Sequence, residues 1–92
     1  MTVHILKTWP EPFAEVAKGL KKHEIRKNDR DFQARDVVVL REWIPSSRTY
    51  TGRQIELTIG HVTRGPDWGV PEGLAVFTIL DESETYYADE HT

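Results

Sequence analysis

The sequence predicts a single small α+β domain, mainly β: a mixed β-barrel of about five or six strands with one short N-terminal helix. Ninety-two residues are enough for one hydrophobic core but not for two. Short apolar or alternating runs typical of strands recur along the chain, and one early stretch has helical spacing. A small sheet leaves exposed edges, and closure into a barrel removes them.

The chain begins with a predicted strand over residues 3–7, in which Val3 and Ile5 share one face and His4 and Leu6 share the other. The short connections that follow in the sequence predict that neighbouring strands run antiparallel.

A short helix is predicted over roughly residues 10–18, because two prolines in the first turn leave few backbone donors unsatisfied there. Apolar residues then recur at positions i, i+3, i+4 and i+7, namely Phe13, Val16, Ala17 and Leu20. Gly19 is a natural stop, because glycine accepts the left-handed conformation that ends many helices.

The remaining strands are predicted at residues 23–27, 37–43, 54–59 and 74–80. Ile25 is the aliphatic residue of the first of these strands, so we expect it on the core face. Residues 50–53 predict a tight turn, and Gly60 predicts a bulge that lets Val62 change face. Residues 1–80 thus form the predicted domain, followed by an acidic, frayed tail at residues 81–92.

The composition excludes several classes of protein. The longest apolar run is four residues, so no membrane-spanning helix is expected. The absence of cysteine excludes disulfides, zinc ribbons and thiol nucleophiles, and the four histidines lack metal-ligand spacing, so no metal or cofactor is predicted. With no signal peptide visible, we expect a cytoplasmic protein that is a monomer or a weak homodimer.

The net charge of −3 conceals two different regions. Residues 81–92 contain five acidic residues and no Lys or Arg, whereas residues 1–80 contain 12 Lys and Arg against ten acidic residues. Seven of the bases lie between Lys18 and Arg35. This distribution fits one or a few nucleotides bound at a single basic cleft better than a long tract of nucleic-acid backbone.

The basic region contains one group of residues that suits ligand binding. If residues 23–27 are extended, Glu24 and Arg26 share a face of the strand, with Lys21 in the turn before it. Lys21 and Arg26 suit a phosphate, and Glu24 suits an exposed amino group of a base. A purely structural salt bridge that holds the helix–strand junction is the alternative.

Gly19, Lys21, Glu24 and Arg26 match the pattern G-x-K-x-x-E-x-R, which resembles the signature of ASCH domains, relatives of the PUA domain. The rest of residues 3–80 is similar to the short DUF3850 branch of that superfamily, found in bacteria and phages. The similar features are the first strand with His4 and Leu6, the Pro-Glu-Pro-Phe helix start, residues 24–32, Asp36, residues 40–43 and residues 50–53.

This resemblance implies a PUA-like barrel with a cleft beside the helix and an RNA- or nucleotide-binding role. The candidate ligand-binding residues are Lys21, Lys22, Glu24, Arg26, Lys27, Arg30, Trp9 and Trp68. The two tryptophans are included because an exposed indole can stack on an unpaired base.

Two other functions stay open at this stage. Some ASCH relatives are amidohydrolases that act on acetylated cytidine, and others are nucleases, so a hydrolase using Lys21, Glu24 and Glu72 is one alternative. In the amidohydrolases a threonine, thought to be the nucleophile, stands where this chain has Glu24. The second alternative is a phage accessory module that contacts a basic protein partner through the acidic tail.

Overall fold

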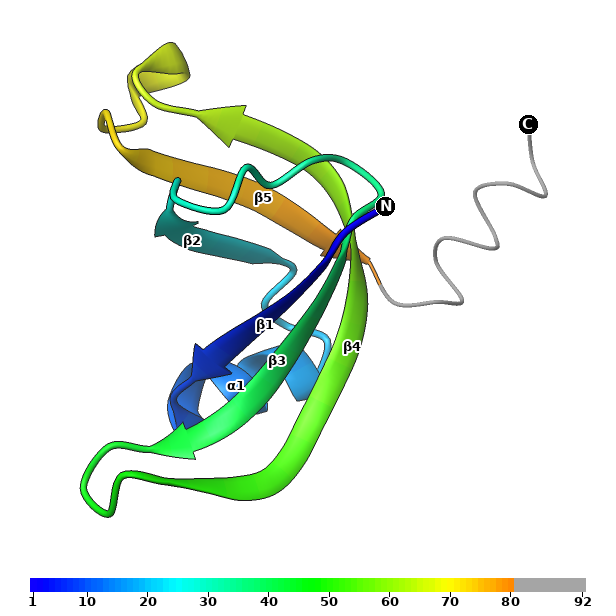
Figure 1. The fold of residues 1–92 in the computed structure, drawn as a ribbon, viewed down its shortest axis with the longest axis vertical. Coiled ribbons are helices and arrows are strands. Elements are labelled where there is room, and N and C mark those ends of the chain that lie inside the picture. Colours follow the sequence, from blue (N-terminus) through cyan, green and yellow to red (C-terminus); the bar gives the residue numbers. More distant parts are fainter. Residues whose placement is uncertain (81–92) are drawn as a thin grey trace, which may run out of the picture.

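The computed structural model describes residues 1–80, which form a curved five-stranded sheet and a short helix (Figure 1). The elements are β1 (Val3–Thr8), α1 (Pro10–Ala17), β2 (His23–Lys27), β3 (Val37–Ile44), β4 (Thr49–Arg64), the 3-10 turn η1 (Asp67–Gly69) and β5 (Leu74–Leu80). The strand order is β1-β3-β4-β5-β2, and the sheet curves into a half-barrel, which confirms the mainly β fold. The tail predicted at residues 81–92 lies outside the described residues.

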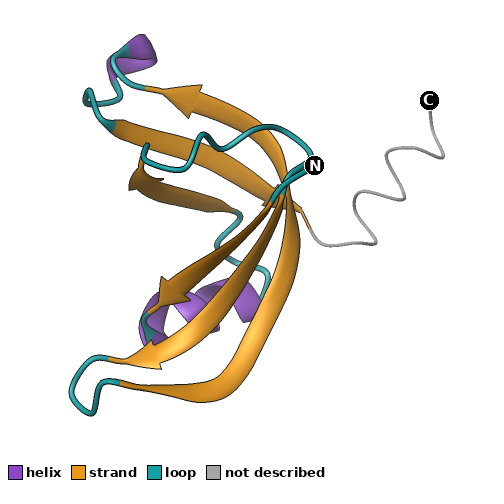
Figure 2. Ribbon diagram, viewed as in Figure 1, coloured by secondary structure: helices purple, strands orange, loops and turns teal. Residues whose placement is uncertain are grey.

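Strand β4 gives the sheet its curvature, because it pairs with both halves of the half-barrel (Figure 2). Residues 49–58 pair with β3, and residues 58–64 pair with β5. The register with β5 shifts around Gly60, so the predicted bulge is confirmed. A Cβ atom on Gly60 would lie 2.6 Å from the Thr78 hydroxyl, so any side chain here would have to displace Thr78 where β5 approaches this bend.

Helix α1 begins and ends as predicted, but only part of its predicted apolar stripe is buried. Phe13 and Val16 are buried, as the helical spacing predicts. Gly19 has a φ of 77° and ends the helix in the left-handed conformation. Leu20 therefore lies beyond the helix and is exposed, and Ala17 is exposed too, so the predicted burial of these two side chains is wrong.

Two predicted connections are also wrong. Strands β1 and β3 pair in parallel, because the segment between them contains α1 and β2 and returns the chain to the same end of the sheet. Residues 50–53 lie inside β4 instead of forming a turn. The turn consists of residues 45–48, where the Arg48 N–H donates to the Ile44 carbonyl at 2.8 Å.

The hydrophobic core is formed by one face of the sheet together with α1. Its largest fully buried side chains are Phe13, Phe32, Phe77, Leu40, Ile59 and Val38. Phe32 comes from the long loop between β2 and β3, and its ring centroid lies 4.7 Å from that of His4 and 4.8 Å from that of Phe77. These ring contacts pack the loop between β2 and β3 against the core. Across residues 1–80, no helix has the length and apolar character needed to cross a bilayer.

A buried pair joins the start of β1 to the start of β3. His4 Nε2 lies 2.8 Å from Asp36 Oδ2, and the two residues are 5% and 4% exposed. The carboxylate also accepts hydrogen bonds from the backbone N–H groups of Thr2 and Gln33, each at 3.1 Å. Burial raises the pKa of Asp36, but the hydrogen bonds from His4, Thr2 and Gln33 outweigh burial and hold this pKa below its ordinary value of 3.8.

The variant Asp36→Asn is expected to weaken the dependence of folding stability on acid pH. The unfolded carboxyl group takes up its proton near 3.8, whereas the folded one does so only at lower pH. The stabilisation is therefore complete above 3.8 and is lost as the pH falls through the folded pKa. Thermal midpoints measured from neutral to strongly acidic pH should fall more steeply for the wild type than for the variant. Exposed Asp29→Asn is the control, and equal curves for Asp36→Asn and wild type would contradict the assignment.

Candidate ligand-binding cleft

The motif residues meet at the open side of the half-barrel, between the edge strands β1 and β2. Glu24 is 3% exposed, whereas Ile25, which the sequence predicts in the core, is 56% exposed. The alternation in β2 is as predicted, but its two faces are exchanged. Glu24 can face inward because two neighbouring cations compensate the burial of its charge.

Both oxygens of the Glu24 carboxylate are paired. Lys21 Nζ contacts Oε2 and also donates to the His23 carbonyl at 2.7 Å. Arg26 Nη2 lies 2.9 Å from Oε1. The sequence places these three charged residues within six positions, and the turn after α1 turns Lys21 back onto the strand that follows. The result is a buried carboxylate held between two partly exposed cations.

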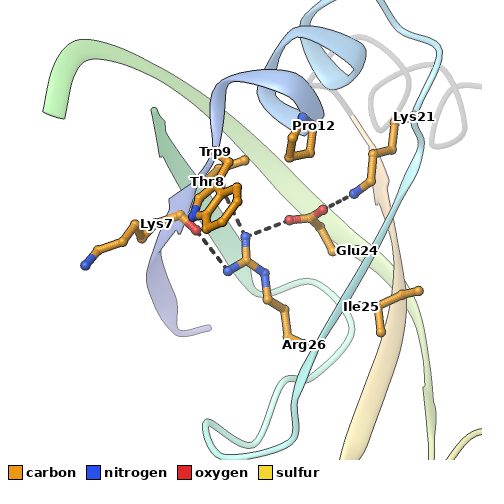
Figure 3. Close-up of a pocket in the computed structure, with 8 residues that line it drawn as sticks. All are labelled: Lys7, Thr8, Trp9, Pro12, Lys21, Glu24, Ile25 and Arg26. Atoms are coloured by element: carbon orange, nitrogen blue, oxygen red, sulfur yellow. Dashed lines mark hydrogen bonds and ion pairs between the residues drawn. The ribbon is translucent and has the colours of Figure 1, made fainter. Parts of the chain in front are cut away.

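Arg26 also connects β2 to β1, as Figure 3 shows. Its Nη1 donates to the Lys7 carbonyl at 3.0 Å, and its Nη2 donates to the Thr8 hydroxyl at 3.2 Å. Arg30, in the following loop, donates to the Ile5 carbonyl at 3.0 Å. Among the described residues, β1 and β2 are the two edges of the sheet, so arginine side chains link them where a backbone ladder would close a barrel.

A cleft of about 370 Å³ lies beside this network. Lys7, Thr8, Trp9 and Pro12 line it from β1 and the start of α1, and Lys21, Glu24, Ile25 and Arg26 line it from the opposite side. The Trp9 side chain stands at the cleft and is 55% exposed (Figure 3). Lys7 contributes its backbone carbonyl, because its ammonium group turns away and lies 3.9 Å from the ring centroid of Trp43. The cleft therefore combines an exposed indole with one carboxylate and two cations.

The other predicted site residues lie in different places. Lys27 and Arg30 line a second pocket of about 320 Å³ that adjoins the first, and Lys22 is exposed beside Lys21. Trp68 is 94% exposed in η1, and Glu72 is exposed in the loop before β5. Within residues 1–80, neither of these two residues lines the cleft or the second pocket, so the structure does not bring Glu72 together with Lys21 and Glu24.

Two buried polar residues near the cleft escaped the sequence analysis. Thr8 is 3% exposed, and its partner on β3 is Glu42, which is 6% exposed. Glu42 accepts a hydrogen bond from the Thr51 hydroxyl at 2.8 Å and lies 3.7 Å from Arg53. The burial of Glu42 could have been predicted from the sequence, because Glu42 continues the alternation of Val38 and Leu40 and therefore lies on the same buried face of β3.

The polar groups of the cleft are hydrogen-bonded to one another. Each oxygen of the Glu24 carboxylate is engaged by one cation, Oε2 by Lys21 and Oε1 by Arg26. The hydroxyl of Thr8 accepts a hydrogen bond from Arg26. Within the described part of the chain, no three His, Asp or Glu side chains are grouped closely enough to hold a metal ion.

The comparisons with known proteins identify a family and a phage relative. The family model described as "Domain of unknown function (DUF3850)" matches residues 3–79. A protein of Escherichia phage P2, described as an uncharacterized 12.9 kDa protein in the GpA 3′ region, is 36% identical over 66 residues. The match covers 72% of this chain and 59% of the phage protein, so the chain spans about three fifths of that relative.

Replacing Arg26 by Met is expected to destabilise the fold by about 3 kcal/mol, because the change leaves a buried carboxylate short of one partner. The double variant Glu24→Met/Arg26→Met should recover part of this loss, since an apolar pair of similar volume needs no charge compensation. Urea denaturation followed by tryptophan fluorescence measures both. Glu15→Met, at an exposed position of α1, controls for the new methionine. A double variant less stable than Arg26→Met would argue against this interaction.

Proposed function

This chain belongs to DUF3850, a family of domains of unknown function, and we propose that its cleft binds a nucleotide or a short RNA segment. The main support for the proposal is that one cleft is lined by Trp9, Lys21, Glu24 and Arg26. The motif G-x-K-x-x-E-x-R, which resembles that of ASCH and PUA-like domains, supplies three of these four residues. The ASCH and PUA-like relationship is part of the proposal.

The phosphate of the ligand binds between Lys21 and Arg26. Their side chains are 23% and 25% exposed, so each is anchored on Glu24 yet reaches the cleft. Arginine offers a planar fork that matches phosphate oxygens, and lysine adds a point charge. Glu24 prevents the two cations from being repelled by each other, so the phosphate site is held in place before the ligand arrives.

The base of the ligand stacks on Trp9 and donates to Glu24. An indole exposed at the edge of a cleft offers a flat apolar face, and such stacking contributes about 1–3 kcal/mol per base. An ionised carboxylate has about four acceptor positions. Lys21 and Arg26 engage one oxygen each, so an exocyclic amino group can still donate to Glu24.

The size and charge of the cleft favour a small ligand. A volume of about 370 Å³ lies within the range of roughly 300–1,000 Å³ of small-molecule sites. The modest excess of 12 Lys and Arg over ten acidic residues in residues 1–80 is weak for duplex binding. The proposal is therefore recognition of unpaired nucleotides at one place on the surface.

A hydrolase acting on N4-acylated cytidine or RNA is supported less well. That function needs a proton acceptor at Glu24 and a second carboxylate, and the structure keeps Glu72 apart from the cleft. The third possibility, a protein-binding module that uses the acidic residues 81–92, concerns residues outside the described part of the chain. Binding by the cleft remains the proposal.

The variant Trp9→Ala is expected to weaken binding of short single-stranded RNA about fivefold to 150-fold, because stacking of one base is lost. Trp68→Ala, which removes a still more exposed indole away from the cleft, should leave the affinity unchanged. With about two phosphate contacts, the wild-type affinity should fall roughly sevenfold between 50 and 200 mM salt. Fluorescence anisotropy measures all three, and an equal loss in both Trp variants would contradict the cleft assignment.

Incubation with N4-acetylcytidine is expected to yield no more cytidine than the matched variant Glu24→Gln yields. The physical reason is that Glu72, the second carboxylate that the hydrolase needs, does not line the cleft that holds Lys21 and Glu24. Chromatography of the reaction at high protein concentration measures the product. Turnover by the wild type that disappears in Glu24→Gln would overturn this expectation and favour the hydrolase.

A further inference from the structure

The cleft and the second pocket lie side by side along the line where the edge strands β1 and β2 face each other, which we call the seam. We propose that this seam holds two consecutive unpaired nucleotides, one in the cleft and one in the adjoining pocket. This inference rests on the proposed function and specifies its ligand as a dinucleotide unit. The second pocket, of about 320 Å³, is nearly as large as the cleft. Lys7, Ile25 and Arg26 line both hollows, so the two lie next to each other along the seam.

Arg26 lies at the boundary between the two hollows and is placed to bind the phosphodiester that links the nucleotides. Its guanidinium group has five N–H donors. Three bonds run to the Lys7 carbonyl, the Thr8 hydroxyl and Glu24 Oε1, and they fix the group across the seam. Two donors remain, the Nε–H and one Nη1–H, and one of them can donate to the phosphate that links the two nucleotides. A fixed guanidinium group loses little conformational freedom when it binds a phosphate.

The second pocket has the chemistry that a second nucleotide needs. Arg30 is held by the Ile5 carbonyl, and the plane of its guanidinium group can stack on a base. The carboxylate of Asp29 can accept a hydrogen bond from a base amino group, and the ammonium group of Lys27 adds positive charge. Ile25, 56% exposed, supplies an apolar surface common to both hollows.

The competing occupant of a seam between two strand edges is a peptide strand that extends the sheet, and the structure disfavours it. Strand addition requires free backbone acceptors on the edge. On β1, the carbonyl groups of Ile5 and Lys7 already accept hydrogen bonds from Arg30 and Arg26. On the β2 side, the His23 carbonyl accepts a hydrogen bond from Lys21. These side chains occupy three acceptors of the two edges and place cationic groups along them, which suits a polyanion.

Calorimetric titration compares nucleoside 3′-monophosphates with dinucleoside monophosphates of the same bases, both with a single phosphate. We expect the dinucleoside monophosphate to bind at least tenfold more tightly, because a second base occupies the second pocket. Arg30→Gln should reduce this ratio to threefold or less, and Lys27→Ala, which removes an exposed ammonium group, should reduce it in the same direction. Arg48→Gln, in the exposed turn between β3 and β4, is the matched control and should preserve the ratio.

The outcomes separate this inference from the proposed function. If mononucleotides bind and the dinucleoside monophosphates bind no more tightly, the two-nucleotide inference is wrong and the proposed function stands. If neither class binds, both are wrong. Tighter binding of a hexaglutamate peptide than of any dinucleoside monophosphate would overturn the inference in favour of an acidic protein partner. Circular dichroism of Arg30→Gln confirms that the variant is folded before its ratio is interpreted.

Discussion

The buried carboxylate of Glu24 is the constraint on which the open side of the half-barrel depends. A charge that is 3% exposed requires compensation, and Lys21 and Arg26 provide it from two directions. Arg26 then extends to the Lys7 carbonyl and the Thr8 hydroxyl, so one guanidinium group both neutralises the carboxylate and links the strand edges. The link between the two edge strands and the construction of the cleft therefore depend on the same side chain.

The bend in β4 is the reason that the two edge strands lie on either side of the cleft. The strand pairs with β3 in its first part and with β5 in its second, and the bulge at Gly60 separates the two parts. The sheet thereby brings β1 and β2, its edge strands, toward each other. Exposed strand edges favour aggregation, and charged side chains that cap them reduce this risk. Arg26 and Arg30 cap β1 in this way, while Phe32 and the pair His4–Asp36 hold the connecting loop in place.

The structural and functional interpretations of the motif are compatible. The salt bridge considered as an alternative to a ligand site is present, because Glu24 and Arg26 are paired at the helix–strand junction. A buried ion pair is by itself weak evidence for a stabilising role. The same cations also line a cleft with an exposed indole, an arrangement that a purely structural ion pair would not need. Under the proposed function, the network is a structural link that also holds the two cations in place for an anion.

The sequence by itself determined local features whose causes are local. The ranges of β2 and β5, the end of α1 at Gly19 and the bulge at Gly60 followed from alternation and from glycine conformations. The grouping of Lys21, Glu24 and Arg26 also followed, because these residues are two to five positions apart in one turn and the strand after it. Only the tertiary structure decided that Glu24 faces inward, that Trp9 and not Trp68 stands at the cleft, and that Thr8 lies beside Glu42. These outcomes depend on which distant strands become neighbours, and the pattern of a single segment carries no information about its partner.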